Sequence, residues 1–253
     1  MSRPIHIFAE AFAAALFAIS VLMTGLRTVA PWGRLYTEGV SFDPRRGNIA
    51  MSGNGGLGGP NLLGVIAQPS NPVLWALLIA VMLAALLHLA SRLRNHRAAP
   101  LPVSHTLGLI VASAWPWVLN PAPMAGLAMA LISCALLVHG ITRSPTPDRP
   151  AAHMAAAFIA GWLVIAGTSA LGMVLYRQAG LGLERSVLLG LLLAALVGAW
   201  VQLRIESYAT FSLAIIWAMI GFAAASAGGS ITIATACVLG ISALAVVIVR
   251  VTT

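Results

Sequence analysis

Few side chains in this sequence could do acid–base chemistry inside a long apolar stretch. Glu10 is the one carboxylate within such a stretch. A charge in mid-membrane costs about 2.5–3.5 kcal/mol on insertion scales, so intramembrane carboxylates usually mark ion pathways. Glu10 lies within two turns of the start of its stretch, and we expect its side chain to snorkel to the membrane surface. Because ion-driven transport normally needs more charges than this, the sequence disfavours it.

The histidines are spread along the chain and form no zinc-binding motif. No pair has the i, i+4 or H-E-x-x-H spacing that places two ligands on one helix face. His88 and His139 fall near the ends of apolar stretches, where an isolated histidine can ligate a haem or chlorophyll metal but more commonly marks the interface. The others, expected at interfaces or in loops, are His6, His96, His105 and His153. We therefore expect no metal site.

The motifs of common enzyme classes are missing from the sequence. The glycine-rich tract GNGGLGG follows no expected strand and has no Lys-Ser/Thr, so we interpret it as a flexible loop. The two cysteines, Cys134 and Cys237, fall in apolar stretches with no C-x-x-C spacing, and no G-x-S-x-G or paired-carboxylate arrangement occurs. We expect no enzymatic activity.

Tryptophan is the residue type that stands out. Trp32, Trp75 and Trp200 fall near the ends of apolar stretches, where tryptophan forms the interfacial belt. Trp162 and Trp217 fall in the middle of such stretches. A deep indole offers a flat apolar face and one N–H that needs a partner, which suits a pocket for a planar hydrophobic ligand and equally suits helix packing. The candidate ligand-binding residues are Trp75, Trp115, Trp117, Trp162 and Trp217.

Composition indicates which class of protein must position these side chains. Hydrophobic residues make up 60% of the 253 residues, charged residues 8%, and the mean hydropathy is +0.95. Soluble domains carry about 25% charged residues. Because hydrocarbon leaves backbone polar groups without partners, such a chain spans as helices or as a closed barrel. The apolar stretches are continuous and do not alternate, so we predict an all-α, polytopic transmembrane helical bundle.

At about 20 residues per crossing, the chain divides into about eight spans in a single membrane domain, residues 1–253. The expected spans are residues 5–29, 72–93, 105–119, 122–141, 152–176, 186–203, 208–227 and 230–249. One long polar loop, residues 31–71, follows the first span. The segment Asn120–Pro121 interrupts a stretch too long for one crossing, so spans three and four form a hairpin. An even number of spans places both termini on one side.

Charge and small residues indicate the surroundings of the bundle. The 14 basic residues are all arginine, and they lie between apolar stretches, which indicates lipid head groups as counter-ions and not nucleic acid. Their placement leans towards cytoplasmic termini, and the all-arginine, alanine-rich composition favours a bacterial inner membrane. Small residues four apart let helices approach closely in lipid, so they predict a compact bundle or, alternatively, a homo-oligomer. These stripes are Gly190, Ala194, Gly198; Ala122, Gly126, Ala130; and Gly221, Ala225.

Two segments around the central tryptophans carry a resemblance to a known family. Residues 211–222, FSLAIIWAMIGF, are similar to an aromatic-x-Leu-x-x-x-Trp-Ala-x-x-Gly pattern, and residues 158–166, FIAGWLVIA, to a Gly-Trp-x-x-x-Ala segment. Weaker likenesses occur at Trp75 and at Trp115-Pro-Trp117. On these residues the chain resembles the longer, eight-span branch of the translocator protein, or tryptophan-rich sensory protein (TspO/MBR), family. The Asn that follows the family's Gly-Trp segment is Ala170 here.

The resemblance implies that the chain binds a tetrapyrrole or another flat lipophile and has a sensory, regulatory or transport role. The ligand would lie between spans two, three, five and seven. The alternative is a non-catalytic structural or accessory subunit of a larger membrane complex, with the small-residue stripes and the first loop docking partners. A small-solute transporter is less favoured, because the spans lack polar midplane residues and Gly/Pro breaks apart from Pro116.

Overall fold

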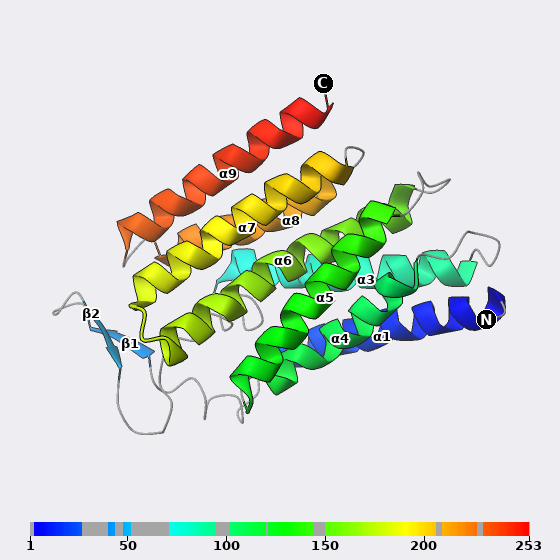
Figure 1. Cartoon of the computed structure of the whole chain (residues 1–253), viewed down its shortest axis with the longest axis horizontal. Coiled ribbons are helices and arrows are strands. Elements are labelled where there is room, and N and C mark those ends of the chain that lie inside the picture. Colours follow the sequence, from blue (N-terminus) through cyan, green and yellow to red (C-terminus); the bar gives the residue numbers. More distant parts are fainter. Residues whose placement is uncertain are drawn as a thin grey trace.

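The protein folds as a bundle of α-helices in the computed structural model (Figure 1). The structure describes residues 3–26, 40–43, 48–51, 71–94, 102–119, 121–143, 150–205, 209–226 and 230–252. Within these ranges the helices are α1 (Arg3–Leu26), α3 (Pro72–Arg94), α4 (Val103–Val118), α5 (Pro123–Arg143), α6 (Pro150–Gln178), α7 (Leu183–Ile205), α8 (Thr210–Ser226) and α9 (Ile231–Thr252). Each helix overlaps one of the eight expected spans, and the predicted all-α polytopic bundle is confirmed.

Not all eight helices have the length of a full membrane crossing. Six are long and apolar enough to span: α1, α3, α5, α6, α7 and α9. The α8 helix has 17 residues and α4 has 16. At 1.5 Å per residue these two measure roughly 24–26 Å against a hydrocarbon core of about 30 Å. The chain is therefore an integral membrane protein with about six long spans and two shorter helices packed among them.

The expected loop 31–71 contains one regular element that the sequence analysis did not predict. Val40–Asp43 (β1) and Asn48–Met51 (β2) pair as antiparallel strands, with Val40 opposite Met51 and Asp43 opposite Asn48. The remainder of this loop, with Trp32 in it, lies outside the described residues.

The α6 helix lies at the centre of the bundle and packs against α3, α5, α7 and α8 (Figure 1). It is apolar around its whole circumference, as expected of a helix with neighbours on every side, and residues 155–166 are buried almost without a break. The α1 helix packs on α3 and α4 at one edge, and α9 packs on α7 and α8 at the other. The start of α1 and the end of α9 both point to the right-hand side of Figure 1, so the termini share one end of the bundle.

Glycines of the small-residue stripes lie in contacts between helices of this chain. A Cβ atom built on Gly190 of α7 would stand 2.9 Å from the carbonyl oxygen of Thr168 on α6. One built on Gly221 of α8 would collide with the Leu74 side chain of α3. These glycines bring helix backbones close together, where dispersion and weak polar contacts replace the missing hydrophobic force. These glycines thus help to build the bundle, whereas Ala122 and Ala225 of the same stripes are exposed.

Replacing Gly161 tests the closest of these approaches. A Cβ there would strike the backbone carbonyl of Phe211 on α8, which cannot rotate away. We expect Gly161→Ala to lower the free energy of unfolding by about 1–3 kcal/mol, as overpacked positions do. Gly167→Ala is the matched control on the same helix, because the nearest atom would be 3.8 Å away. The thermal midpoint of Gly167→Ala, measured in the same detergent as that of Gly161→Ala, should be unchanged or higher than in the wild type, since alanine favours helix. Equal midpoints for the two variants would exclude the close α6–α8 packing.

Candidate functional site

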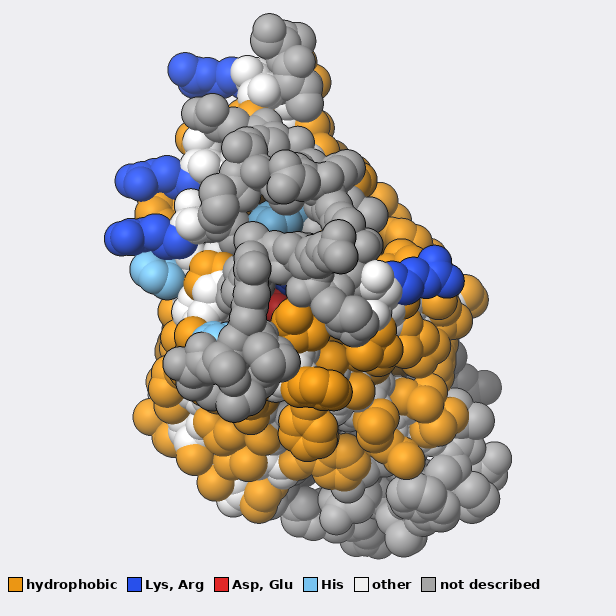
Figure 2. Space-filling view, turned by 90° about the vertical axis from the view of Figure 1, so that its right-hand side faces the viewer, with side chains coloured by type: hydrophobic (Ala, Val, Ile, Leu, Met, Phe, Trp, Pro, Cys, Tyr) orange, Lys and Arg blue, Asp and Glu red, His pale blue; other side chains and the backbone are white. Residues whose placement is uncertain are grey.

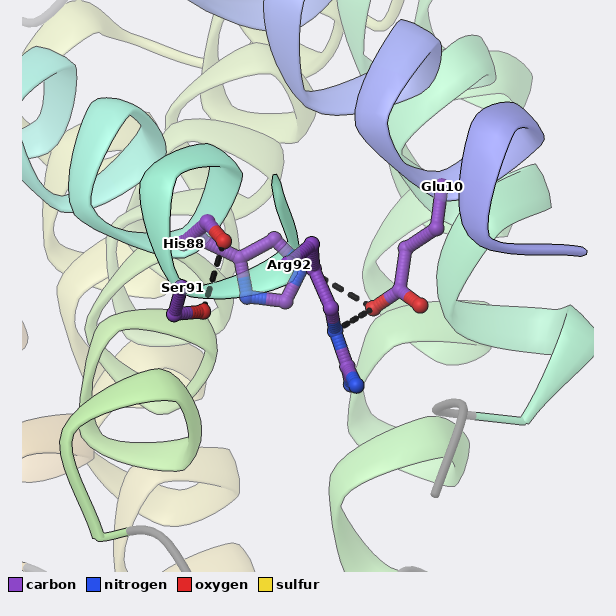
Figure 3. A network of polar contacts seen from close by, with 4 residues as sticks. All are labelled: Glu10, His88, Ser91 and Arg92. Atoms are coloured by element: carbon purple, nitrogen blue, oxygen red, sulfur yellow. Dashed lines mark hydrogen bonds and ion pairs between the residues drawn. The ribbon is translucent and has the colours of Figure 1, made fainter. Parts of the chain in front are cut away.

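Glu10 lies inside the bundle and not at its surface. Its side chain is 1% exposed and points from α1 towards α3 (Figure 3). The carboxylate oxygen Oε1 lies 2.8 Å from Nε of Arg92 and 3.0 Å from Nε2 of His88. The snorkelling expected from the sequence is therefore wrong. A carboxylate in lipid needs a paired charge, and α3 supplies Arg92 as its partner.

The sequence of α3 places both partners on one face of the helix. His88 and Arg92 are four residues apart, about one helical turn, so their side chains lie one above the other. They continue the buried stripe of α3, which consists of Leu74, Leu77, Leu78, Val81, Ala84, Ala85, His88 and Arg92. The sequence of α3 did not show which side faces the interior, because exposed positions such as Leu83 and Leu87 are apolar as well. The hydroxyl of Ser91 donates a hydrogen bond of 2.7 Å to the carbonyl of His88 (Figure 3).

His105 is also buried beside this pair. It lies in the first turn of α4, is 0% exposed, and its ring centroid is 5.3 Å from that of His88 at an angle of 56° between the rings. His105 is helical and α5 covers it, so it does not lie in a loop. Gly140 of α5 permits this close cover: a Cβ built there would stand 3.0 Å from the Cβ of His105.

The cluster holds several buried polar atoms that have no hydrogen-bond partner among the described residues. His153, half-buried in the first turn of α6, lies close enough to interact electrostatically with Arg92 and Glu10. The atoms without a partner are Oε2 of Glu10, Nδ1 of His88, both ring nitrogens of His105 and Nε2 of His153. Each such atom costs about 1–3 kcal/mol in desolvation. Native proteins keep few of them, and their concentration at one place indicates a functional role.

These residues share one end of the bundle. Glu10 and His153 lie in early turns of α1 and α6, and Arg92 lies in the last turn of α3. Figure 2 looks onto this end and shows arginines around its edge with histidine and acidic side chains between them, above apolar flanks. Among the residues that the structure describes, no three His, Cys, Asp or Glu side chains are arranged to hold a metal ion. The cluster combines a carboxylate, a guanidinium and imidazoles, and imidazoles can bind and release protons near neutral pH.

The five candidate tryptophans are distributed over four helices. Trp115 and Trp162 are buried, Trp75 and Trp217 are half-buried, and Trp117 is 38% exposed. The indole of Trp217 on α8 donates a hydrogen bond of 3.1 Å to the carbonyl of Val73 at the start of α3. That of Trp117 donates to the hydroxyl of Ser20 on α1 at 3.0 Å. The indole nitrogens of Trp115 and Trp162 have no partner among the described residues.

Only Trp162 among these five lines the cavity at the junction of α1, α3, α4 and α6. The other lining residues are Ser20, Val21, Thr24, Leu78, Ala112 and Pro116. The cavity measures about 10 Å³, room for about one water molecule, whereas ligand pockets measure about 300–1,000 Å³. The structure thus brings the four helices together at Trp162 but gives the other tryptophans separate neighbours, and ligand binding by the five remains a prediction.

Comparison with known proteins assigns no family to the chain. It matches no model of a protein family, no curated protein and no solved structure. The resemblance to tryptophan-rich sensory proteins therefore stays a prediction from the sequence. The structure itself shows a polytopic helical membrane protein with a buried ionic cluster.

A double-mutant cycle tests the pairing of Glu10 with Arg92. Arg92→Met leaves a buried carboxylate without its cation and should lower the free energy of unfolding by about 3–5 kcal/mol, whereas the double variant Glu10→Leu/Arg92→Met removes both charges and should recover most of that loss. Unfolding in mixed micelles of mild and denaturing detergent measures the free energy of unfolding of both variants.

Arg204→Met is the control for loss of an arginine, because Arg204 is exposed and stacks on Trp200 with its guanidinium 5.4 Å from the ring centroid. Its effect should stay below about 1 kcal/mol. The single variants Glu10→Leu and Arg92→Met should each lower the free energy of unfolding. If these two decreases add up to the decrease in the double variant, the two side chains are not energetically coupled.

Proposed function

We propose that the chain binds a flat lipophilic ligand, such as a tetrapyrrole, at the junction of α1, α3, α4 and α6, and that binding has a sensory, regulatory or transport role. The observation that carries the proposal is the buried indole of Trp162, which is 2% exposed, borders the cavity at this junction and has no described partner for its N–H. No enzymatic step is part of the proposal.

The chemistry of this position fits a planar ligand with a polar edge. An indole presents an apolar face to a ring system and an N–H to an acceptor. Phe17 of α1 packs edge-on to Trp162, with centroids 6.1 Å apart and 72° between the rings, so the aromatic lining continues onto α1. A ligand that accepts a hydrogen bond from this N–H would recover the cost of a buried donor without a partner.

Binding requires the junction to widen, because the cavity is smaller than any such ligand. Pro116 lies inside α4 and lines the cavity. It has no N–H to donate to the carbonyl of Ala112, which lines the same cavity, so the helix is weakened at this point. Prolines are the commonest sites of helix bending. Bending of α4 away from α1 at Pro116 is the motion by which we propose that the ligand enters.

The alternative role, an accessory subunit, has less support among the described residues. The glycines of the small-residue stripes contact other helices of the same chain and are not left for a partner. The apolar face of α9, where Ile231 is 85% exposed and Val246 67% exposed, suits lipid without any partner subunit. Extraction in gentle detergent followed by native mass measurement separates the roles, because an accessory subunit brings other subunits with it.

Titration with protoporphyrin, followed by tryptophan fluorescence, tests the binding proposal. We expect saturable quenching of the wild-type protein in detergent and at least about tenfold weaker binding in the Trp162→Leu/Trp217→Leu variant, which corresponds to ~1.4 kcal/mol. Trp200→Leu is the matched control, because its side chain is 54% exposed on the outside of α7 and its loss should leave the affinity unchanged. Absence of quenching, or equal affinity in the double variant, would refute the proposal.

A further inference from the structure

The cluster of Glu10, His88, Arg92 and His105, called here the Glu10 cluster, has no part in binding at Trp162. None of its residues lines the cavity there or the second cavity between α6, α7 and α8. Its four side chains are at most 4% exposed and come from three helices.

We propose that the Glu10 cluster is a proton-binding site that exchanges protons with the aqueous phase at the end of the bundle where α1 begins and α3 ends. A proton is the one ligand that needs no cavity, and the cluster offers it several nitrogen and oxygen atoms that have no other described partner. It adds to a ring nitrogen lone pair and leaves an imidazolium, with no other bond made or broken.

The hydrogen-bond pattern assigns a starting state to His88. An ionised carboxylate can only accept hydrogen bonds, so Nε2 of His88 must donate to Oε1 of Glu10 across their 3.0 Å contact. In the neutral ring, Nδ1 then carries the free lone pair, and this atom has no partner among the described residues. His105 keeps one free lone pair in either tautomer. The cluster therefore presents two acceptors for a proton, one on each ring.

The surrounding charges limit the cluster to one proton. Glu10 and Arg92 cancel one another, so the first imidazolium has the carboxylate as a second partner. A second imidazolium would stand 5.3 Å from the first, beside the Arg92 guanidinium, and like charges at this range disfavour it strongly. His88 and His105 thus share a single proton, and its binding is a property of the pair.

The charged and titratable groups beside the cluster come from α1, α3 and α6. On α1, His6 lies one turn before Glu10 and is half-buried; on α3, Arg94 is exposed at the helix end; on α6, His153 is half-buried. The α5 helix meets His105 with Gly140, which carries no charge. His6 and His153 are less buried than the cluster and lie in early turns of α1 and α6, at the end of the bundle from which a proton arrives.

Magnetic resonance of the full-length protein with isotope-labelled histidine rings, titrated from about pH 8 to about pH 5, tests this site. Ring nitrogen shifts report the protonation and tautomer of each histidine, with signals assigned by substitution. We expect His88 and His105 to take up a first proton together, and a second proton at least about tenfold more weakly. In His105→Gln, which keeps the Glu10–Arg92 pair intact, a single uptake step at His88 should remain.

Glu10→Gln should weaken the first uptake at least about tenfold, because the imidazolium loses its counter-charge. His139→Gln is the matched control: His139 is exposed on α5, and its loss should leave the titration of the pair unchanged. The proposal is overturned if neither ring takes a proton above about pH 5, if the two rings titrate independently with equal affinity, or if Glu10→Gln titrates as the wild type does. None of these readouts involves the lipophilic ligand, so they stand apart from binding at Trp162.

Discussion

Hydrocarbon offers no hydrogen bonds, so each polar group of this chain that enters the membrane needs its partner within the protein. The helices satisfy the backbone. Single hydroxyls within helices bond to carbonyls one turn back, as Ser133 does to Ala130 at 2.8 Å and Ser169 to Ile165 at 2.7 Å. A carboxylate has no such local solution, and the ion pair of Glu10 with Arg92 at 2.8 Å ties α1 to α3 across 82 residues of sequence. The atoms around His105 without a described partner depart from this constraint, as do the indole nitrogens of Trp115 and Trp162.

Close packing of α6 is the second condition for the arrangement. Its small residues allow α3, α5, α7 and α8 to surround it, and Gly161 lets the backbone of α8 approach so closely that a methyl group would not fit. The same contact fixes Trp162, the next residue, against Phe17 on α1. The close packing of α6 and the position of the candidate ligand site therefore depend on two adjacent residues, Gly161 and Trp162.

The two candidate sites share α1, α3, α4 and α6 but lie at different depths. Glu10 and Ser20, ten residues apart on α1, are separated by about 15 Å along the helix axis. The first belongs to the ionic cluster near the end of the bundle, and the second lines the cavity beside Trp162 and donates a hydrogen bond of 2.6 Å to the carbonyl of Ser113 on α4. The α1 helix is thus held at two levels, by charge at one and by hydroxyl groups at the other.

Local features of the sequence were enough to predict the helices. Apolar length, proline breaks and small-residue spacing placed eight helices along the chain, and they indicated close packing at Gly190 and Gly221, because each of these features acts within one segment. The shorter length of α8 and the hairpin at 40–51 were not predicted. Neither were the partners of the predicted tryptophans.

The ionic cluster is the part of the structure that the sequence predicted least. Glu10 was visible as a lone carboxylate, but α3 is apolar on both its buried and its exposed sides, so its sequence did not show that His88 and Arg92 face inwards. Only the packing of α1, α3, α4 and α5 decided that Glu10 is paired and that His105 is covered by Gly140. Periodicity along a chain does not say which side of such a helix is buried, and the identity of the neighbour depends on how all the helices fill space together.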